Sequence, residues 1–276
     1  MKAAAFDYMR ARDVAEACAA LAQGNGKAKL LAGGQSLGPM LNLRLARPKL
    51  LIDVSRIQAL AGIEDKADAW HIGAGVTHSR LEDAAGKLGG GAMLAHVAGG
   101  IAYRAVRNRG TIGGSLAHAD PAADWPLALA ALDAAVVIRG RAGSRRVAAD
   151  RFMKSAFTTE LAADEIVEAI IVPKLSAGAR WGYHKFCRKT GEFPEASAAC
   201  VLDPERRLAR IYVGALTGAP QPLAGLARAA AERGLAACTR EAIHEAVAAA
   251  APQLDAIDRR MHAGVVARAL QKTFQS

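Results

Sequence analysis

The chain has 276 residues and a formal net charge of +10 at pH 7, with 52% hydrophobic and 5% aromatic residues. This length predicts two or three compact units, and this composition excludes a disordered chain. No apolar run approaches the roughly 20 residues that a membrane span needs. Charged residues also interrupt the N-terminal segment, where a signal peptide would have its apolar core. We therefore expect a cytoplasmic protein without a membrane span.

The positive charge does not by itself indicate nucleic-acid binding. Lys and Arg are spread along the chain, and no aromatic-and-basic sheet motif accompanies them. The densest basic group consists of Arg139, Arg141, Arg145 and Arg146. We expect no nucleic-acid partner, because charge of this kind can equally steer an anionic cofactor or an acidic protein partner.

The cysteines form no metal-binding or disulfide pattern. They are Cys18, Cys187, Cys200 and Cys238, and no two are spaced as Cys-x-x-Cys. This scatter argues against an iron–sulfur cluster, a zinc site or a disulfide framework within the chain. We expect these side chains to behave as small buried hydrophobic groups and predict no metal site.

The first predicted unit, residues 1–56, alternates short strands with helices. The expected elements are a helix from the cap Asp13 to Gln23, a strand over Lys29–Ala32, a helix from the cap Ser36 to Leu45, and a strand over Leu50–Val54. The second strand would lie beside the first in one sheet, as in a β-α-β unit.

A glycine pair, Gly33-Gly34, lies between the strand and helix of this first unit. Glycine has no Cβ, so it can take positive φ and let successive amides point into one concavity that binds anionic oxygens. Ser36 adds a hydroxyl donor beside a helix N-terminus. Taken singly, such a pair after a strand is more often an ordinary turn.

The second predicted unit, residues 57–176, has a similar glycine pair. The expected elements are a strand over Trp70–Gly75, a helix from the cap Thr77 to Leu88 that ends before Gly89-Gly90-Gly91, a helix over Trp125–Leu132, and strands over Ala134–Ile138 and Glu165–Val172. The second pair, Gly113-Gly114, is flanked by Thr111 and Ser115 and precedes a polar, turn-rich stretch to Asp124. Two such turns, each with hydroxyl groups, suit the binding of a diphosphate.

The third predicted unit, residues 177–276, is an antiparallel sheet followed by helices. Its expected strands are Trp181–Cys187, Ala196–Leu202 and Ala209–Ala215, and its expected helices lie around Leu223–Arg233, Thr239–Ala250 and Leu254–Gln271. The whole chain therefore reads as an α+β protein.

These motifs together resemble a known family. The run Ala32-Gly33-Gly34-Gln35-Ser36, the run Thr111-Ile112-Gly113-Gly114-Ser115 and the run Asp120-Pro121-Ala122-Ala123-Asp124 are similar to those of the FAD-binding medium subunit of molybdenum hydroxylases. These are relatives of carbon monoxide dehydrogenase and xanthine dehydrogenase. The resemblance implies a two-part FAD-binding region of the PCMH type, like the vanillyl-alcohol-oxidase-type fold, followed by the three-stranded antiparallel sheet with its helices.

The resemblance also implies the site residues. FAD would lie between the first two units, with its diphosphate on both glycine turns and its flavin ring at the edge that faces the third unit. The implied contacts on the diphosphate and adenosine side are Lys29, Leu30, Leu31, Ala32, Gly33, Gly34, Gln35 and Ser36. Thr111, Gly114 and Ser115 would close over the diphosphate from the other side. The other implied contacts are Ile101, Asp124, Val167, Lys185, Glu192 and Phe193. Without this resemblance, we would interpret Ile101 as a core residue, Asp124 as a helix cap and Lys185 as a solvated charge.

Relatives often have Asp-Tyr where this chain has Glu192-Phe193. A phenylalanine keeps the stacking of an aromatic ring on the flavin but lacks the tyrosine hydroxyl. The electron acceptor that oxidises the flavin can therefore differ from that of the relatives. His78 and His118 lie close in sequence to the implied site, and we expect neither to be catalytic.

The implied function is that of an FAD-carrying, electron-transfer subunit of a heterotrimeric molybdenum hydroxylase, an oxidoreductase. A small subunit with two-iron clusters would deliver electrons, a large molybdenum-cofactor subunit would act on the substrate, and FAD would pass electrons to an external acceptor. The complex would be a dimer of heterotrimers. One alternative is a self-sufficient FAD-dependent oxidoreductase of the same fold, and another is a cofactor-free basic binding module.

Overall fold

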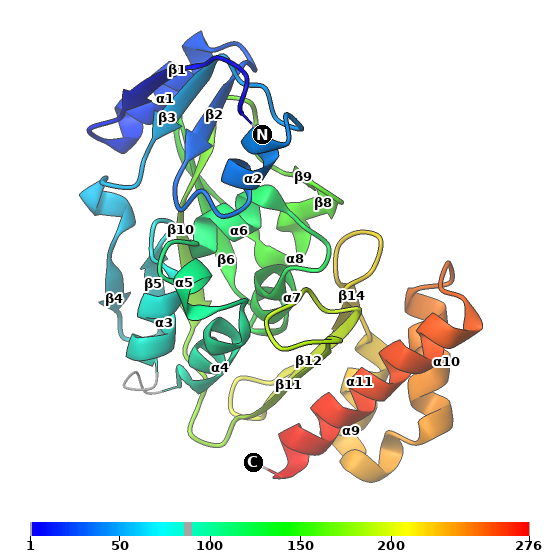
Figure 1. The fold of residues 1–276 in the computed structure, drawn as a ribbon. Helices are drawn as coiled ribbons and strands as arrows, with labels where there is room; N and C mark the ends of the chain where they lie inside the picture. The colour runs from blue at the N-terminus through cyan, green and yellow to red at the C-terminus, as the bar shows by residue number, and fades with distance from the viewer. Residues whose placement is uncertain (1, 86–89, 276) are drawn as a thin grey trace.

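Three sheets follow one another along the chain in the computed structural model, which describes residues 2–85 and 90–275 (Figure 1). The first has three strands, the second five and the third four, and a small two-stranded sheet accompanies the second. Helices lie between and beside these sheets, so the predicted α+β class is confirmed. Every helix among the described residues is too short or too polar to span a membrane.

The first sheet is parallel, with the strand order β1-β3-β2. Its elements are β1 (Asp7–Arg10), α1 (Val14–Gln23), β2 (Ala28–Leu31), α2 (Leu37–Asn42) and β3 (Leu50–Asp53). The predicted cap of α1 is confirmed, because the Asp13 side chain accepts a hydrogen bond of 2.8 Å from the Glu16 amide. Strand β1 was not predicted, since its four residues are mostly exposed and show no apolar alternation.

Helix α2 begins where predicted but ends earlier. Ser36 precedes the helix as expected, but its side chain makes no capping hydrogen bond. The helix ends at Asn42 rather than Leu45, because Arg44 takes a left-handed conformation with φ of 59° that stops a right-handed helix.

The second sheet is antiparallel, with the strand order β4-β5-β10-β6-β7. Its strands are β4 (Ile63–Asp65), β5 (Ala69–Gly73), β6 (Ala135–Gly140), β7 (Gly143–Ala148) and β10 (Ile166–Pro173). Its helices are α3 (His78–Ala85), α4 (Ala92–Gly100), α5 (Arg104–Arg107), α6 (Ile112–His118), α7 (Asp124–Ala131), α8 (Ala149–Phe152) and the 3₁₀ turn η1 (Gln58–Leu60). Strands β8 (Met153–Ser155) and β9 (Thr158–Thr159) form the small sheet.

Two predictions for this unit concern the helix after Thr77. The Thr77 hydroxyl accepts a hydrogen bond of 3.3 Å from the Arg80 amide, so the predicted cap is confirmed. The predicted end at Leu88 and the glycine break at Gly89 lie outside the described residues.

The third sheet is antiparallel, with the strand order β11-β12-β13-β14. Its strands are β11 (Arg180–Phe186), β12 (Ala196–Asp203), β13 (Leu208–Gly214) and β14 (Gln221–Pro222), and its helices are α9 (Ala224–Arg233), η2 (Leu235–Ala237), α10 (Arg240–Ala250) and α11 (Ala256–Gln275). The three predicted strands are confirmed, and the short β14 adds a fourth. The predicted cap of α10 is also confirmed, since Thr239 accepts a hydrogen bond of 3.2 Å from the Ala242 amide.

The chain has two hydrophobic cores. One core runs without a break through the first and second sheets and reaches one face of the third sheet. The other lies between the opposite face of the third sheet and helices α9–α11. Strand β12 separates the two, because Ala199 and Val201 pack in the first core while Ala198 and Cys200 pack in the second. The predicted boundaries near residues 56 and 176 stay predictions.

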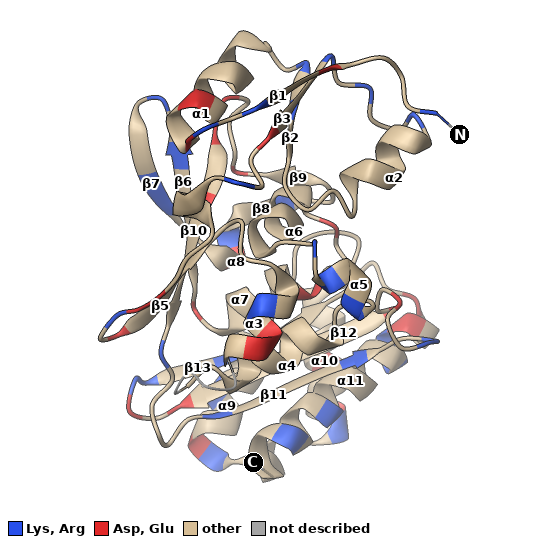
Figure 2. Cartoon of the chain, turned by 60° about the vertical axis from the view of Figure 1, so that its left-hand side comes forward, with Lys and Arg blue, Asp and Glu red and all other residues tan. Residues whose placement is uncertain are grey.

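The predicted burial of the cysteines is confirmed for three of the four. All four cysteines are free, with Cys18, Cys200 and Cys238 buried and Cys187 half-buried. Lys and Arg are distributed over many elements rather than gathered on one sheet face (Figure 2). No group of three or more His, Cys, Asp or Glu residues among the described part of the chain could hold a metal ion.

Candidate functional site

The two glycine pairs, far apart in the sequence, meet in the structure. We call residues 32–36 the first glycine segment and residues 110–115 the second. A Cβ atom added to Gly33 would lie 1.9 Å from the Arg109 carbonyl oxygen and 2.9 Å from the Gly110 Cα. The two backbones therefore touch at Gly33, and only a residue without a side chain allows this approach.

The first glycine segment presents free amides. None of the described residues accepts a hydrogen bond from the backbone N–H groups of Gly33, Gly34, Gln35 or Ser36. Gly34 has φ of +71°, a left-handed conformation that lets successive amides converge. The Ser36 hydroxyl is also unpartnered among the described residues. Four successive unpaired donors in a partly buried loop form a cradle for an anion, because unpaired amides gain most from a charged acceptor.

The second glycine segment is built differently from its prediction. Gly113 and Gly114 do not form a turn with positive φ, but lie in the first turn of helix α6. The Thr111 hydroxyl caps this helix and accepts a hydrogen bond of 3.0 Å from the Gly114 amide. The amides of Ile112 and Gly113 donate to carbonyls in the loop after β5, at 3.1 and 3.0 Å.

The glycine at 113 is explained by packing. A Cβ atom there would lie 2.4 Å from the Ala74 Cβ and 2.8 Å from the Ala74 backbone. Because these first amides already have acceptors within the protein, the segment has no free cradle of its own. Gly114 is exposed and Ser115 is half-buried, and the Ser115 hydroxyl has no partner among the described residues.

His78 supports the second glycine segment. Its amide donates to the Gly110 carbonyl at 2.9 Å, and a Cβ atom on Gly110 would lie 2.9 Å from the His78 ring. The ring is buried, and its Nδ1 accepts a hydrogen bond of 3.1 Å from the Trp125 indole. Burial, with a smaller contribution from Arg107, lowers the pKa of His78 to about 4. His78 is therefore neutral at pH 7, and its contacts support the second glycine segment.

Asp124 is the centre of a second group of predicted site residues. It is the first residue of α7 and only 7% exposed, and its carboxylate accepts hydrogen bonds from the Tyr183 hydroxyl at 2.6 Å and from Lys185 Nζ at 2.9 Å. Ala123, rather than Asp124, holds the N-cap position. Reading Asp124 as a helix cap is therefore wrong, because its carboxylate is engaged with β11 instead. Burial and the charge of Asp124 raise the pKa of Tyr183.

Lys185 connects this group to the end of α4. Besides its ion pair with Asp124, its ammonium donates to the Gly100 carbonyl at 2.9 Å. The side chain is only 16% exposed, so reading Lys185 as a solvated charge is wrong. A hollow of about 360 Å³ adjoins it, lined by His96, Gly99, Gly100, Tyr183, His184, Lys185 and Lys272.

Ile101 follows Gly100 in a loop that Arg107 holds. The Arg107 guanidinium donates to the carbonyls of Ile101 and Ala102 at 3.0 and 2.9 Å, and pairs with Glu82 at 2.9 Å. Arg107 lowers the pKa of Glu82. Ala102 takes a left-handed conformation with φ of 42°. Sequence reasoning missed Arg107 and Glu82, although the basic run after the apolar helix was a signal for an arginine in this place.

The remaining predicted residues lie in three places. Lys29 is exposed on β2, while Leu30 and Leu31 beside it are half-buried. Val167 lies at a bulge in β10 and packs in the first core. Glu192 and Phe193 are exposed on the loop between β11 and β12, where Phe193 is 64% exposed. His118 packs against Phe157, with the ring centroids 5.2 Å apart and the ring planes tilted by 50°.

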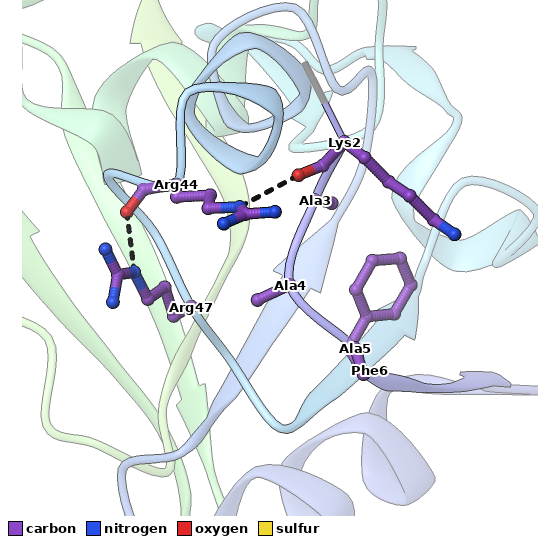
Figure 3. A pocket seen from close by; sticks show the side chains of 7 residues that line it. All are labelled: Lys2, Ala3, Ala4, Ala5, Phe6, Arg44 and Arg47. Carbon is purple, nitrogen blue, oxygen red and sulfur yellow. Dashed lines mark hydrogen bonds between the residues drawn. The ribbon is translucent and has the colours of Figure 1, made fainter.

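A second hollow at the N-terminus does not belong to this constellation (Figure 3). Lys2, Ala3, Ala4, Ala5, Phe6, Arg44 and Arg47 line it, and none of them is a predicted site residue. Its arginines are tied to the backbone, since Arg44 donates to the Lys2 carbonyl and Arg47 to the Arg44 carbonyl, each at 3.0 Å.

The constellation fits the diphosphate of a dinucleotide. The first glycine segment offers four unpaired amides, and the Ser36 and Ser115 hydroxyls from the two segments are free to donate. The close approach at Gly33 places the two segments against each other. Asp124, Lys185 and Ile101 form a separate group of polar and apolar side chains toward the third sheet.

Comparison with known proteins supports this interpretation. Residues 4–175 match the family described as the FAD binding domain in molybdopterin dehydrogenase. The chain is 38% identical to the 6-hydroxypseudooxynicotine dehydrogenase complex subunit alpha of Paenarthrobacter nicotinovorans, over 79% of this chain and 74% of that protein. It is 41% identical to the carbon monoxide dehydrogenase medium chain of Hydrogenophaga pseudoflava, over 71% of this chain and 69% of that one.

Solved structures agree over the whole length. The fold superposes on a chain of the H. pseudoflava carbon monoxide dehydrogenase that lacks the Mo-pyranopterin moiety of its cofactor, with a TM-score of 0.90 at 35% identity, covering 100% of this chain and 99% of that one. It superposes on a chain of quinoline 2-oxidoreductase from Pseudomonas putida 86 with a TM-score of 0.88 at 30% identity and the same coverage.

Proposed function

The chain belongs to the family of FAD-binding domains in molybdopterin dehydrogenases, whose members are oxidoreductase subunits, and from this premise we propose that it is the FAD-carrying, electron-transfer subunit of a heterotrimeric molybdenum hydroxylase. One observation supports the proposal above the others. The first glycine segment, with four unpaired amides, is held against the second by a contact that only Gly33 permits.

Each group of site residues has a role in binding the cofactor. The amides of Gly33 to Ser36 bind the diphosphate, and Thr111, Gly114 and Ser115 close over it from α6. Lys29, Leu30, Leu31 and Ala32 line the adenosine side. The flavin end rests against Ile101 and Val167 and faces Asp124 of the second unit together with Lys185, Glu192 and Phe193 of the third unit.

The protein binds and orients FAD, while FAD supplies the redox chemistry when bound. The Lys185–Asp124 ion pair is buried enough that Lys185 stays fixed, so its ammonium provides a positive charge at a constant place. Because the Asp124 carboxylate neutralises this charge, the pair acts on a nearby ring as an oriented dipole rather than as a net positive charge. We assign the role of general base to no side chain of this subunit.

The partners and the location complete the proposal. Several relatives are named as a medium chain or as a subunit of a complex. By analogy, a small iron–sulfur subunit passes electrons to FAD, a large molybdenum-cofactor subunit acts on the substrate, and the complex doubles into a dimer of heterotrimers in the cytoplasm. An external acceptor then receives the electrons.

The first test is FAD binding by the isolated full chain. The chain is incubated with FAD, free cofactor is removed, and the visible spectrum is recorded; we expect flavin absorption at about one FAD per chain. A folded chain that binds no FAD, both alone and in the complex purified from its native cell, would refute the proposal. Molybdenum and iron in that complex distinguish a heterotrimer from a self-sufficient oxidoreductase, which would contain FAD alone.

A further inference from the structure

We propose that Tyr103 is a flavin-contacting residue, which places a phenol ring and its hydroxyl on the bound cofactor beside Phe193. This inference rests on the proposed function. It assigns the hydroxyl at this end of the site to the residue that precedes α5 in the second unit, because Phe193 of the third unit offers a ring without a hydroxyl.

Tyr103 differs from every other tyrosine of the chain. The chain has four tyrosines, and three of them donate to a carboxylate: Tyr8 to Asp53 at 2.5 Å, Tyr183 to Asp124 at 2.6 Å and Tyr212 to Asp150 at 3.0 Å. The Tyr103 hydroxyl has no partner among the described residues, and its side chain is 62% exposed. An exposed aromatic side chain with a free hydroxyl is suited to contact a ligand that is flat and partly polar.

The ring of Tyr103 lies against the loop that carries Phe193. A Cβ atom on Gly191 would lie 3.1 Å from Tyr103 Cε1 and 3.2 Å from Cζ, the carbon that bears the hydroxyl. Gly191 has φ of +90°, so both its conformation and its missing side chain admit the tyrosine ring. Tyr103 and Phe193, at 62% and 64% exposure, are thus two exposed rings on adjoining segments from different units.

The segment that carries Tyr103 is fixed in place. Arg107 holds the carbonyls of the two preceding residues, Ile101 and Ala102, and is itself paired with Glu82. Tyr103 is then the N-cap residue of α5, with extended φ and ψ of −98° and 157°. Since the backbone on both sides is held, the segment that carries the ring is fixed before a ligand arrives, which lowers the entropy cost of binding.

The same segment joins the flavin end of the proposed site. Gly100, directly before Ile101, accepts a hydrogen bond from Lys185, and Lys185 pairs with Asp124. Tyr103 is three residues further along this clamped loop. The two rings therefore lie at the rim of the group that faces the flavin, where one aromatic ring can stack and the neighbouring hydroxyl can bond to a polar atom of the cofactor.

The test compares Tyr103→Phe, which removes only the hydroxyl, with Tyr103→Leu, which removes the ring. The matched control is Phe157→Leu, because Phe157 is also 62% exposed but lies on the turn between β8 and β9. The full chain is loaded with FAD, and the dissociation constant and the emission of the bound flavin are measured. A phenol close to an excited flavin donates an electron to it and quenches its emission, whereas a benzene ring does not.

We expect Tyr103→Phe to raise the emission of bound FAD, and Tyr103→Leu also to weaken FAD binding about fivefold. Phe157→Leu leaves both unchanged. Introducing Phe193→Tyr into the Tyr103→Phe chain restores the quenching. Wild-type emission and affinity in both Tyr103 variants would overturn the inference alone, while an unsubstituted chain that binds no FAD would overturn the proposed function and this inference with it.

Discussion

The two Gly-Gly pairs of this chain have the same sequence but satisfy different steric demands. In the first pair, Gly33 allows two backbones to touch and Gly34 takes a left-handed φ of +71°. In the second pair both glycines are helical, and Gly113 is required because a side chain would overlap Ala74. The first pair leaves its amides free, while the second uses them within the fold.

The first pair therefore serves cofactor binding, whereas the second pair serves the stability of the fold. Free amides next to a left-handed glycine form an anion cradle, whereas amides that already have acceptors contribute to stability. A substitution in the first pair should therefore affect FAD affinity more than folding, and one in the second should affect folding more than affinity. Gly33 lies at the contact between the two segments and should affect both.

The largest effect is expected for Gly33→Ala. The new Cβ would overlap the Arg109 carbonyl, which is backbone and cannot move aside cheaply. We expect the free energy of unfolding to fall by about 3 kcal/mol and FAD affinity to fall at least about 100-fold. Urea unfolding and FAD titration measure the two effects.

The control for this variant is Gly38→Ala. Gly38 lies in α2 with no heavy atom within 4 Å of an added Cβ, so alanine should stabilise the helix by about 0.5 to 1 kcal/mol. Near-normal FAD binding by Gly33→Ala would show that the contact between the segments is not needed for the site.

Acid should destabilise the fold around the second glycine segment by protonating His78. Because the pKa of His78 is lowered to about 4 from 6.5, the folded protein holds the ring neutral while the unfolded chain protonates it. Stability is therefore complete above pH 6.5 and falls as the pH drops to about 4, with a loss of about 3 kcal/mol.

Urea unfolding at a series of pH values measures this loss. The substitution His78→Asn retains a hydrogen-bond acceptor for Trp125 but cannot be protonated, so it should flatten the pH dependence in this range. An unchanged slope in that variant would assign the acid sensitivity to other groups.

A smaller loss of stability is expected for Gly113→Ala. The methyl group would lie 2.4 Å from the Ala74 Cβ, and α6 must shift away from the loop after β5. We expect the free energy of unfolding to fall by about 2 kcal/mol. The FAD affinity of the folded protein should stay within about threefold of normal. Stability that is unchanged while FAD binding disappears would reverse the roles we assign to the two pairs.

The smallest effect on stability is expected for Gly34→Ala. The added Cβ meets only the Leu31 side chain, at 3.3 Å, so the main cost is about 1 kcal/mol for a left-handed alanine. FAD affinity should fall about tenfold, since relief of that strain turns the amides out of the cradle. Gly34→Asn tolerates the left-handed conformation and should restore most of the affinity; equal losses in both variants would argue against this backbone explanation.

Much of the fold was determined by local sequence. The caps Asp13, Thr77 and Thr239 are confirmed, because a side chain that accepts from an amide three residues ahead is a local feature. The three strands of the third sheet are confirmed for a similar reason, since runs of β-forming residues between turns select strands locally. Strand β1 escaped prediction because its pairing with β3, and not its composition, makes it a strand.

The site was only half determined in this way. The sequence by itself marked both glycine pairs, Asp124 and Lys185, together with the family that they resemble. It could not tell that Gly33 touches Gly110, that Gly113 packs on Ala74, or that Tyr103 lies against Gly191. A residue pattern specifies the backbone of its own segment, whereas these contacts join segments that are distant along the chain, and only the packing of the sheets and helices brings them within van der Waals distance.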